Sequence, residues 1–74
     1  MYRLDFYVPE AHLERVKTAI FDAGAGDFGK YDKCCWVTKG EGQFRSLAGA
    51  SPFIGKVDEL HTEPEVKVEV ICSD

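Results

Sequence analysis

The chain has 74 residues, and its 13 acidic and nine basic side chains give a formal net charge of −4. A composition that is 45% hydrophobic and 30% charged is typical of one folded soluble domain at this length. The negative balance argues against nucleic acid as the main partner, because binding phosphates needs a basic surface. No apolar run approaches the roughly 20 residues of a membrane helix, so no membrane-spanning segment is predicted. A domain this small also has little core to spare for a deep enzymatic pocket.

The first 23 residues predict a strand followed by a helix. Residues 2–8 alternate in polarity, and their apolar side chains share one face: Tyr2, Leu4, Phe6 and Val8. Pro9 ends this strand and suits the first turn of a helix, where its missing N–H would be unpaired anyway. Residues 10–23 then place apolar side chains on one helical stripe: Leu13, Val16, Ile20 and Ala23. Gly24 is the expected stop signal of this helix.

The middle of the chain predicts a β-hairpin. Residues 33–39 and 43–47 are two runs of strand-forming residues, and the glycine-bearing segment 40–42 between them predicts the turn. Residues 48–55 are rich in glycine, serine and proline but contain apolar side chains, so we expect a loop folded against the sheet.

The last predicted strand covers residues 66–72. Its apolar side chains alternate onto one face: Val66, Val68, Val70 and Cys72. A short extended piece around residues 56–57 and a polar passage over residues 58–65 precede it.

The order strand, helix, hairpin, strand predicts an α+β fold, the βαββ portion of a ferredoxin-like unit. We expect one domain, residues 1–74, with an antiparallel sheet, one covering helix, and the last helix and strand of the unit missing at the C-terminal end. One helix leaves roughly half of its side of the sheet bare, which a soluble monomer rarely tolerates. We therefore expect either a second subunit or a longer chain to cover it.

The cysteines predict a reducing compartment. The chain has three cysteines, Cys34, Cys35 and Cys72, and an odd number cannot be fully paired within the chain. A disulfide between the two adjacent cysteines would be strained. The N-terminal residues lack the features of a secretory signal, so we expect a cytoplasmic protein. No C-x-x-C motif supports a zinc ribbon or a thioredoxin-type site.

The candidate metal ligands are Cys34, Cys35 and His61. Adjacent strand residues point to opposite faces, so the two cysteines cannot hold one ion without a bulge, although one of them with His12, His61 or Cys72 could bind a soft metal. The simpler interpretation is a small core cysteine beside a partly exposed one, with both histidines at the surface. No third group orients a cysteine–histidine pair for catalysis, so we predict no catalytic residue and no cofactor.

The candidate interface residues are Trp36, Phe44, Phe53 and Ile54. We expect Trp36 and Phe44 to face each other across the predicted hairpin, with the other two nearby. Ordinary core packing would explain such a cluster, but an oligomer interface is favoured because the bare sheet needs a cover.

Several segments resemble the domain inserted in Nif-three-like (YqfO-type) proteins, and together they extend over essentially the whole chain. These segments are Phe6-Tyr7-Val8-Pro9-Glu10, Gly40-Glu41-Gly42-Gln43-Phe44, Gly49-Ala50-Ser51-Pro52-Phe53-Ile54-Gly55 and Glu65-Val66-Lys67-Val68-Glu69-Val70. The resemblance implies a ferredoxin-like unit similar to CutA and PII-type signalling proteins, which associate in threes. It carries over no metal site, because the ligands of the family's two-metal core belong to segments that this chain does not contain.

These observations favour a non-enzymatic oligomerisation or regulatory module that forms a homo-oligomer, with a trimer favoured. One alternative is a metal-binding or metal-dependent hydrolase-related protein with cysteine and histidine ligands shared between subunits. Another is a sensor of a nucleotide-type small ligand at subunit clefts. The sequence names no ligand or pathway.

Overall fold

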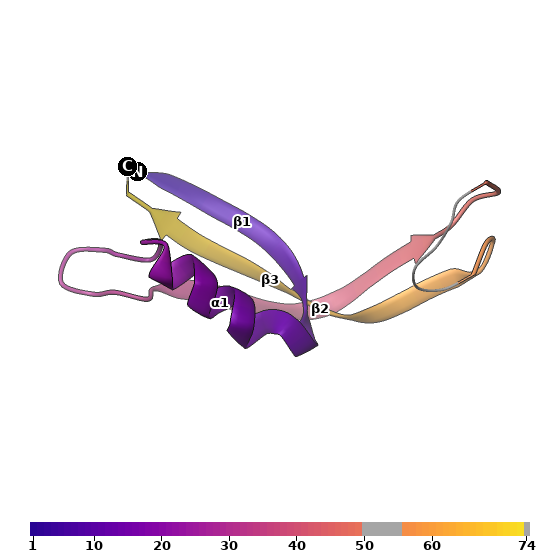
Figure 1. Cartoon of the computed structure of the whole chain (residues 1–74), viewed down its shortest axis with the longest axis horizontal. Coiled ribbons are helices and arrows are strands. Elements are labelled where there is room, and N and C mark those ends of the chain that lie inside the picture. The colour runs from indigo at the N-terminus through magenta and orange to yellow at the C-terminus, as the bar shows by residue number, and fades with distance from the viewer. Residues whose placement is uncertain (50–55, 74) are drawn as a thin grey trace.

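The computed structural model describes residues 1–49 and 56–73, and in them it shows an antiparallel sheet with one α-helix across one face (Figure 1). The elements in chain order are β1 (Tyr2–Pro9), the 3-10 turn η1 (Glu10–His12), α1 (Leu13–Asp22), β2 (Cys35–Arg45) and β3 (Leu60–Cys72). The three strands lie in the order β1-β3-β2, so the last strand is central. This is the order expected of the first three strands of a ferredoxin-like unit, and it confirms the predicted α+β fold.

The core lies between α1 and the middle of β3. Val66, Val68 and Val70 are at most 1% exposed, and the register places Val8, Phe6 and Leu4 of β1 opposite them in turn. Leu13 and Val16 of the helix pack against this cluster. The alternation predicted in both strands is confirmed, because the apolar side chains of each face the helix.

The helix begins and ends close to its predicted limits. Pro9 is followed by the short 3-10 turn and then by α1, so the first turn is tighter than the helix predicted from residue 10. After the helix, Gly24 adopts a φ of +103°, as expected of a glycine stop.

Gly26 ties the loop after the helix to the sheet. Its N–H donates to the Ile71 carbonyl at 2.7 Å, and its carbonyl accepts from the Cys34 N–H at 2.9 Å. Its φ is +86°, and a Cβ placed there would lie 3.0 Å from both the N and the O of Cys34. Only glycine fits this junction without displacing the neighbouring backbone.

The turn predicted at residues 40–42 is wrong. β2 runs straight through these residues, with Gly40 opposite Glu65 and Gly42 opposite Glu63. Gly42 accommodates a neighbouring side chain, since a Cβ there would lie 2.7 Å from Oε2 of Glu65, whereas a Cβ on Gly40 would meet only the Glu65 carbonyl, at 3.9 Å. The two predicted hairpin strands are therefore one strand, which pairs with β3.

The predicted last strand is confirmed but begins six residues earlier, at Leu60. Pro64 does not interrupt it, because the final β1–β3 pair is Pro9 with Glu65 and β3 has no β1 neighbour beyond that point. A proline is tolerated in a strand that has become an edge. The predicted fold of residues 48–55 falls mostly on residues 50–55, which lie outside the described residues.

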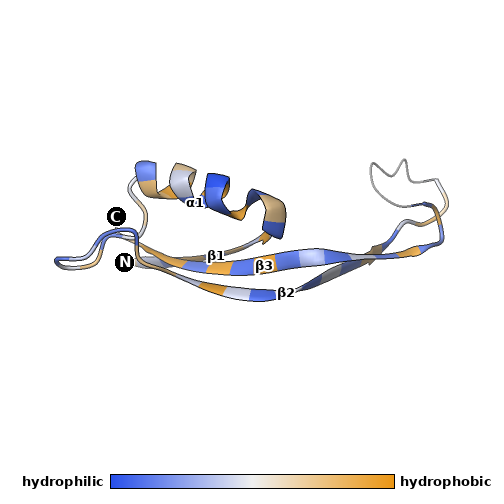
Figure 2. Cartoon of the chain, turned by 90° about the horizontal axis from the view of Figure 1, so that it is seen from below, coloured by the Kyte–Doolittle hydropathy of each residue, from blue (hydrophilic) through white to orange (hydrophobic). Residues whose placement is uncertain are grey.

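Beyond the end of β1, strands β2 and β3 continue as a two-stranded ribbon, clearly separate from the helix (Figures 1 and 2). We call residues 40–46 and 57–65 the arm; a bridge between Ser46 and Val57 marks its outer end. The molecule measures 50 × 21 × 17 Å, and its radius of gyration of 15.6 Å exceeds the about 11 Å expected of a compact chain of this length.

This elongated shape leaves an unusually large surface. The accessible area is 5748 Å², whereas a compact monomer of 8.3 kDa exposes about 4,600 Å². The excess is roughly 1,200 Å², and exposed side chains of the sheet and the arm, such as Tyr7, Trp36 and Leu60, contribute to it. Among the described residues, no helix is long and apolar enough to cross a bilayer.

The junction at Gly26 gives a testable prediction for stability. Gly26→Ala should lower the free energy of unfolding by about 2–3 kcal/mol, because both backbone strain and a clash with Cys34 oppose it. Gly24→Ala is the matched control, since its φ is also positive but no atom lies within 4 Å of the added Cβ. It should cost about 1–2 kcal/mol. Equal losses in chemical denaturation would show that the Gly26 contacts are unimportant.

Candidate functional site

The face of the sheet opposite α1 has no covering element among the described residues, and we call it the open face (Figure 2). Besides Pro9, Gly40 and Gly42, the pairing register assigns to it three residues of β1, three of β2 and six of β3. They are Arg3, Asp5, Tyr7, Trp36, Thr38, Phe44, His61, Glu63, Glu65, Lys67, Glu69 and Ile71. Opposite charges alternate over the body of the sheet, where Arg3 contacts Asp5 at 3.1 Å and Lys67 approaches Glu69 at 3.8 Å.

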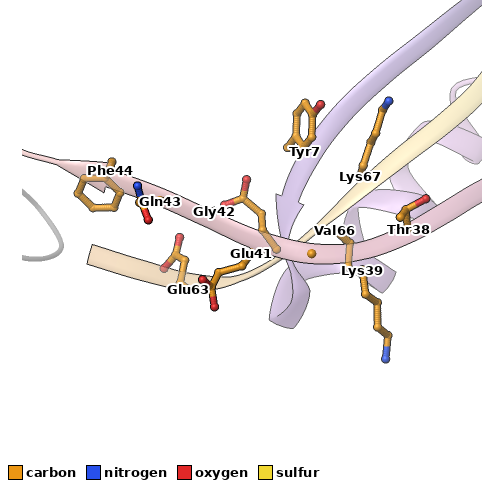
Figure 3. Close-up of a pocket in the computed structure, with 12 residues that line it drawn as sticks. Tyr7, Thr38, Lys39, Glu41, Gly42, Gln43, Phe44, Glu63, Val66 and Lys67 are labelled. Carbon is orange, nitrogen blue, oxygen red and sulfur yellow. The ribbon is translucent and has the colours of Figure 1, made fainter. Parts of the chain in front are cut away.

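A groove of about 530 Å³ lies where the body of the sheet meets the arm (Figure 3). Gly40 and Gly42 form part of its lining, and the side chains around it include Tyr7, Phe44 and Glu63. Two glycines at alternate positions remove the side chains of β2 from this stretch of the open face. Glu65 of the same chain fills part of this space, since its Oε2 would lie 2.7 Å from a Cβ on Gly42.

The groove is acidic. Among the described residues, no lysine, arginine or histidine nitrogen lies within 4 Å of the carboxylates of Glu41 and Glu65, and Glu63 contacts His61 alone, at 3.5 Å. Two lysines also line the groove, but their ammonium groups lie near other carboxylates: Lys39 is 3.2 Å from Glu10 and Lys67 is 3.8 Å from Glu69. This electrostatic environment favours a cationic group over an anionic one.

His61 and Phe44 form the main side-chain contact of the arm. Their ring centroids are 4.9 Å apart with an interplanar angle of 49°. Nε2 of His61 is inaccessible to solvent and makes no hydrogen bond; Oε2 of Glu63 is 3.5 Å away. The contact joins β2 to β3 where no other element supports them.

Trp36 lies on the same face at the other end of β2. Its Nε1–H donates to Oγ1 of Thr38 at 3.1 Å, which holds the indole along the strand although the residue is 67% exposed. The predicted contact of Trp36 with Phe44 across a hairpin is wrong, because both residues belong to one strand. Eight residues of strand separate them by about 26 Å. Phe53 and Ile54 lie outside the described residues.

One chain does not bring the candidate metal ligands together. Cys35 lies opposite Val70 on the helix side of the sheet, whereas His61 lies opposite Phe44 on the open face, about 30 Å along β3. Cys34 precedes the strand, with its Sγ 3.6 Å from the Asp32 carbonyl. Within residues 1–49 and 56–73, no three cysteine, histidine or acidic side chains are grouped to hold a metal ion. Ligands shared between subunits stay a prediction.

The two remaining candidates are also separate. His12 lies in η1, where its Nδ1 is 3.0 Å from Nη2 of Arg15, and Cys72 lies opposite Tyr2 at the far end of β3. All three cysteines are free thiols. Sequence reasoning missed the groove, although glycines at 40 and 42 opposite glutamates at 65 and 63 are a recognisable signal once the pairing is known.

Comparison with known proteins shows which proteins this chain is similar to in sequence. The chain is 44% identical over 69 residues to the GTP cyclohydrolase 1 type 2 homolog of Bacillus subtilis and 46% identical over 66 residues to that of Mycobacterium tuberculosis. These matches cover 93% and 89% of this chain but 18% and 17% of the relatives. No family model matches the chain.

A solved structure agrees with these relatives. The crystal structure of a Bacillus cereus protein related to NIF3 superposes with a TM-score of 0.74 and 32% identity, over 92% of this chain and 16% of that one. The chain is therefore related, over nearly its whole length, to one segment of the Nif-three-like (YqfO-type) family. It spans less than a fifth of these relatives, so their named activity is a property of much longer proteins.

The contact between Phe44 and His61 gives a prediction for the stability of the arm. Phe44→Ala should cost about 1 kcal/mol locally and accelerate amide exchange about fivefold in residues 42–44 and 61–63, because an aromatic pair is lost. Trp36→Ala is the control, since it removes an aromatic ring from the same strand but outside the arm. Unchanged exchange in Phe44→Ala would mean that the ring contact does not stabilise the ribbon.

Proposed function

We propose that the chain is a non-enzymatic assembly module that associates with further copies of itself through the open face and the arm. The observation that carries the proposal is the roughly 1,200 Å² of surface in excess of a compact monomer. A standard protein–protein interface buries about 800 Å² on each partner, so this excess is enough for a stable contact.

The composition of the open face supports an interface. Trp36, Tyr7 and Arg3 are exposed on it, and tryptophan, tyrosine and arginine are the residue types most enriched at the energetic centres of interfaces. The hydrogen bond from Trp36 to Thr38 fixes the indole before any partner arrives, which lowers the entropy lost on binding. Phe44 extends the apolar contribution onto the arm.

A trimer is the assembly that we favour. The likeness to CutA and PII-type subunits, implied by the family resemblance, is part of this proposal. So is a location in the cytoplasm, where three free thiols stay reduced.

The rival functions have less support from the site. The relatives are named as homologs of GTP cyclohydrolase 1 type 2. The groove is lined by three glutamates and by two lysines that lie near carboxylates of Glu10 and Glu69, a balance that disfavours the phosphates of a nucleotide. Within the described residues, no three cysteine, histidine or acidic side chains are grouped to hold a metal ion.

Sedimentation equilibrium at micromolar concentration tests the proposal. The chain should sediment as an oligomer, and Trp36→Asp should weaken the association at least tenfold, because a charge replaces an aromatic anchor. Thr18→Asp, on the exposed side of α1, is the control and should leave the mass unchanged. A monomer at all concentrations, with the far-ultraviolet spectrum of a folded chain, would overturn the proposal.

A further inference from the structure

We propose that the arm of one copy docks end to end on a second copy, with Glu63 and Glu65 receiving the ammonium groups of Lys30 and Lys33. This inference rests on the proposed self-association and names the surfaces that meet. It makes the contact head-to-tail, so that each copy uses two different surfaces.

The arm needs a partner surface. A two-stranded ribbon is at best marginally stable in water when nothing packs on it. Here β2 and β3 pair along the whole arm, from Gly40 with Glu65 to Arg45 with Leu60, and β1 pairs only with its inner end, through Pro9 and Glu65. Exposed apolar residues remain on it, among them Phe44 at 41% and Leu60 at 63%.

The charge of the arm determines what can cover it. Its residues include five acidic side chains and one basic side chain, Arg45, so the arm carries −4, while the rest of the chain has eight of each and is neutral. The acidic residues are Glu41, Asp58, Glu59, Glu63 and Glu65. Two such arms repel each other, so an arm-to-arm contact is disfavoured. The occupant must present cations instead.

The loop between α1 and β2 presents them at the opposite end of the molecule (Figure 1). Neither Lys30 nor Lys33 has a carboxylate within 4 Å among the described residues, whereas Lys17, Lys39 and Lys67 each lie near a carboxylate of their own chain. Lys56 also has no such neighbour in the described part of the chain, but it adjoins the arm at Val57 and not the opposite end. Asp27 and Asp32 belong to the same loop, so the loop has no net positive charge. What matches the carboxylates of the arm is therefore the pair of ammonium groups themselves.

The groove gives these cations access. The Glu65 carboxylate lies over Gly42, but a Cβ on Gly40 would meet only the Glu65 carbonyl, at 3.9 Å, so a partner's loop can approach the backbone of β2 at Gly40, beside Glu65. A lysine is long enough to reach a carboxylate while its stem lies on the apolar rim formed by Tyr7 and Phe44. A contact between two unlike surfaces closes into a ring when the rotation per copy permits.

Charge reversal with mixing tests this arrangement in the full chain. Variant A carries Glu63→Lys and Glu65→Lys, and variant B carries Lys30→Glu and Lys33→Glu. Each variant alone should associate at least tenfold more weakly than the unaltered chain, because like charges then meet at every contact. An equimolar mixture should recover part of the association, since the lysines at 63 and 65 of A meet the acidic loop of B, and the unaltered arm of B meets the unaltered loop of A. In a closed trimer two of the three contacts are then matched and one is not.

The controls separate this inference from the proposed function. If the unaltered chain associates but neither variant weakens it, or if mixing recovers nothing, the head-to-tail contact is wrong while self-association stands. If the unaltered chain is monomeric, both fail. If variant A does not fold, the neutral changes Glu63→Gln and Glu65→Gln replace it, because they keep the shape of each side chain. Together they should weaken the association and reduce its dependence on salt, and an unchanged dependence would also overturn the contact.

Discussion

The central position of β3 is the constraint on which the rest of the structure depends. Val66, Val68 and Val70 supply the buried row against which the helix packs, and the same strand forms hydrogen-bonded ladders with β1 on one side and β2 on the other. Because β1 is short and β3 is long, the ladder with β1 ends at Glu65. Residues 60–64 of β3 therefore pair with β2 alone, and α1 does not cover them; this strand pair forms the arm.

The arm connects the fold to the proposed function. A strand pair that continues past its core exposes both faces, and such a surface is favourable only when something covers it. The open face offers fixed aromatic residues near the body, and the arm offers carboxylates beside a glycine-lined groove. We interpret these features as a surface suited to another protein chain.

The sequence predicted the parts of the fold that depend on local periodicity. Alternation in residues 2–8 and 66–72 and the helical stripe identified two strands and the helix correctly, because each face meets the same core. The glycines at 40 and 42 led to the wrong prediction of a turn. Closely spaced glycines are typical of a turn, but they also occur in a strand that makes room for a neighbouring side chain. The neighbour, Glu65, lies over 20 residues away, and only the pairing register brings it there. The groove and the separation of Trp36 from Phe44 follow from that register, so neither could be predicted from the sequence.

The central claim is that another copy of the chain covers the arm and the open face. Amide hydrogen exchange, measured over a series of protein concentrations, tests it most directly. The account predicts that residues 40–45 and 60–65 exchange slowly at high concentration and progressively faster on dilution, while Val68 in the core keeps its protection throughout. Exchange in the arm that is fast and independent of concentration would contradict the account.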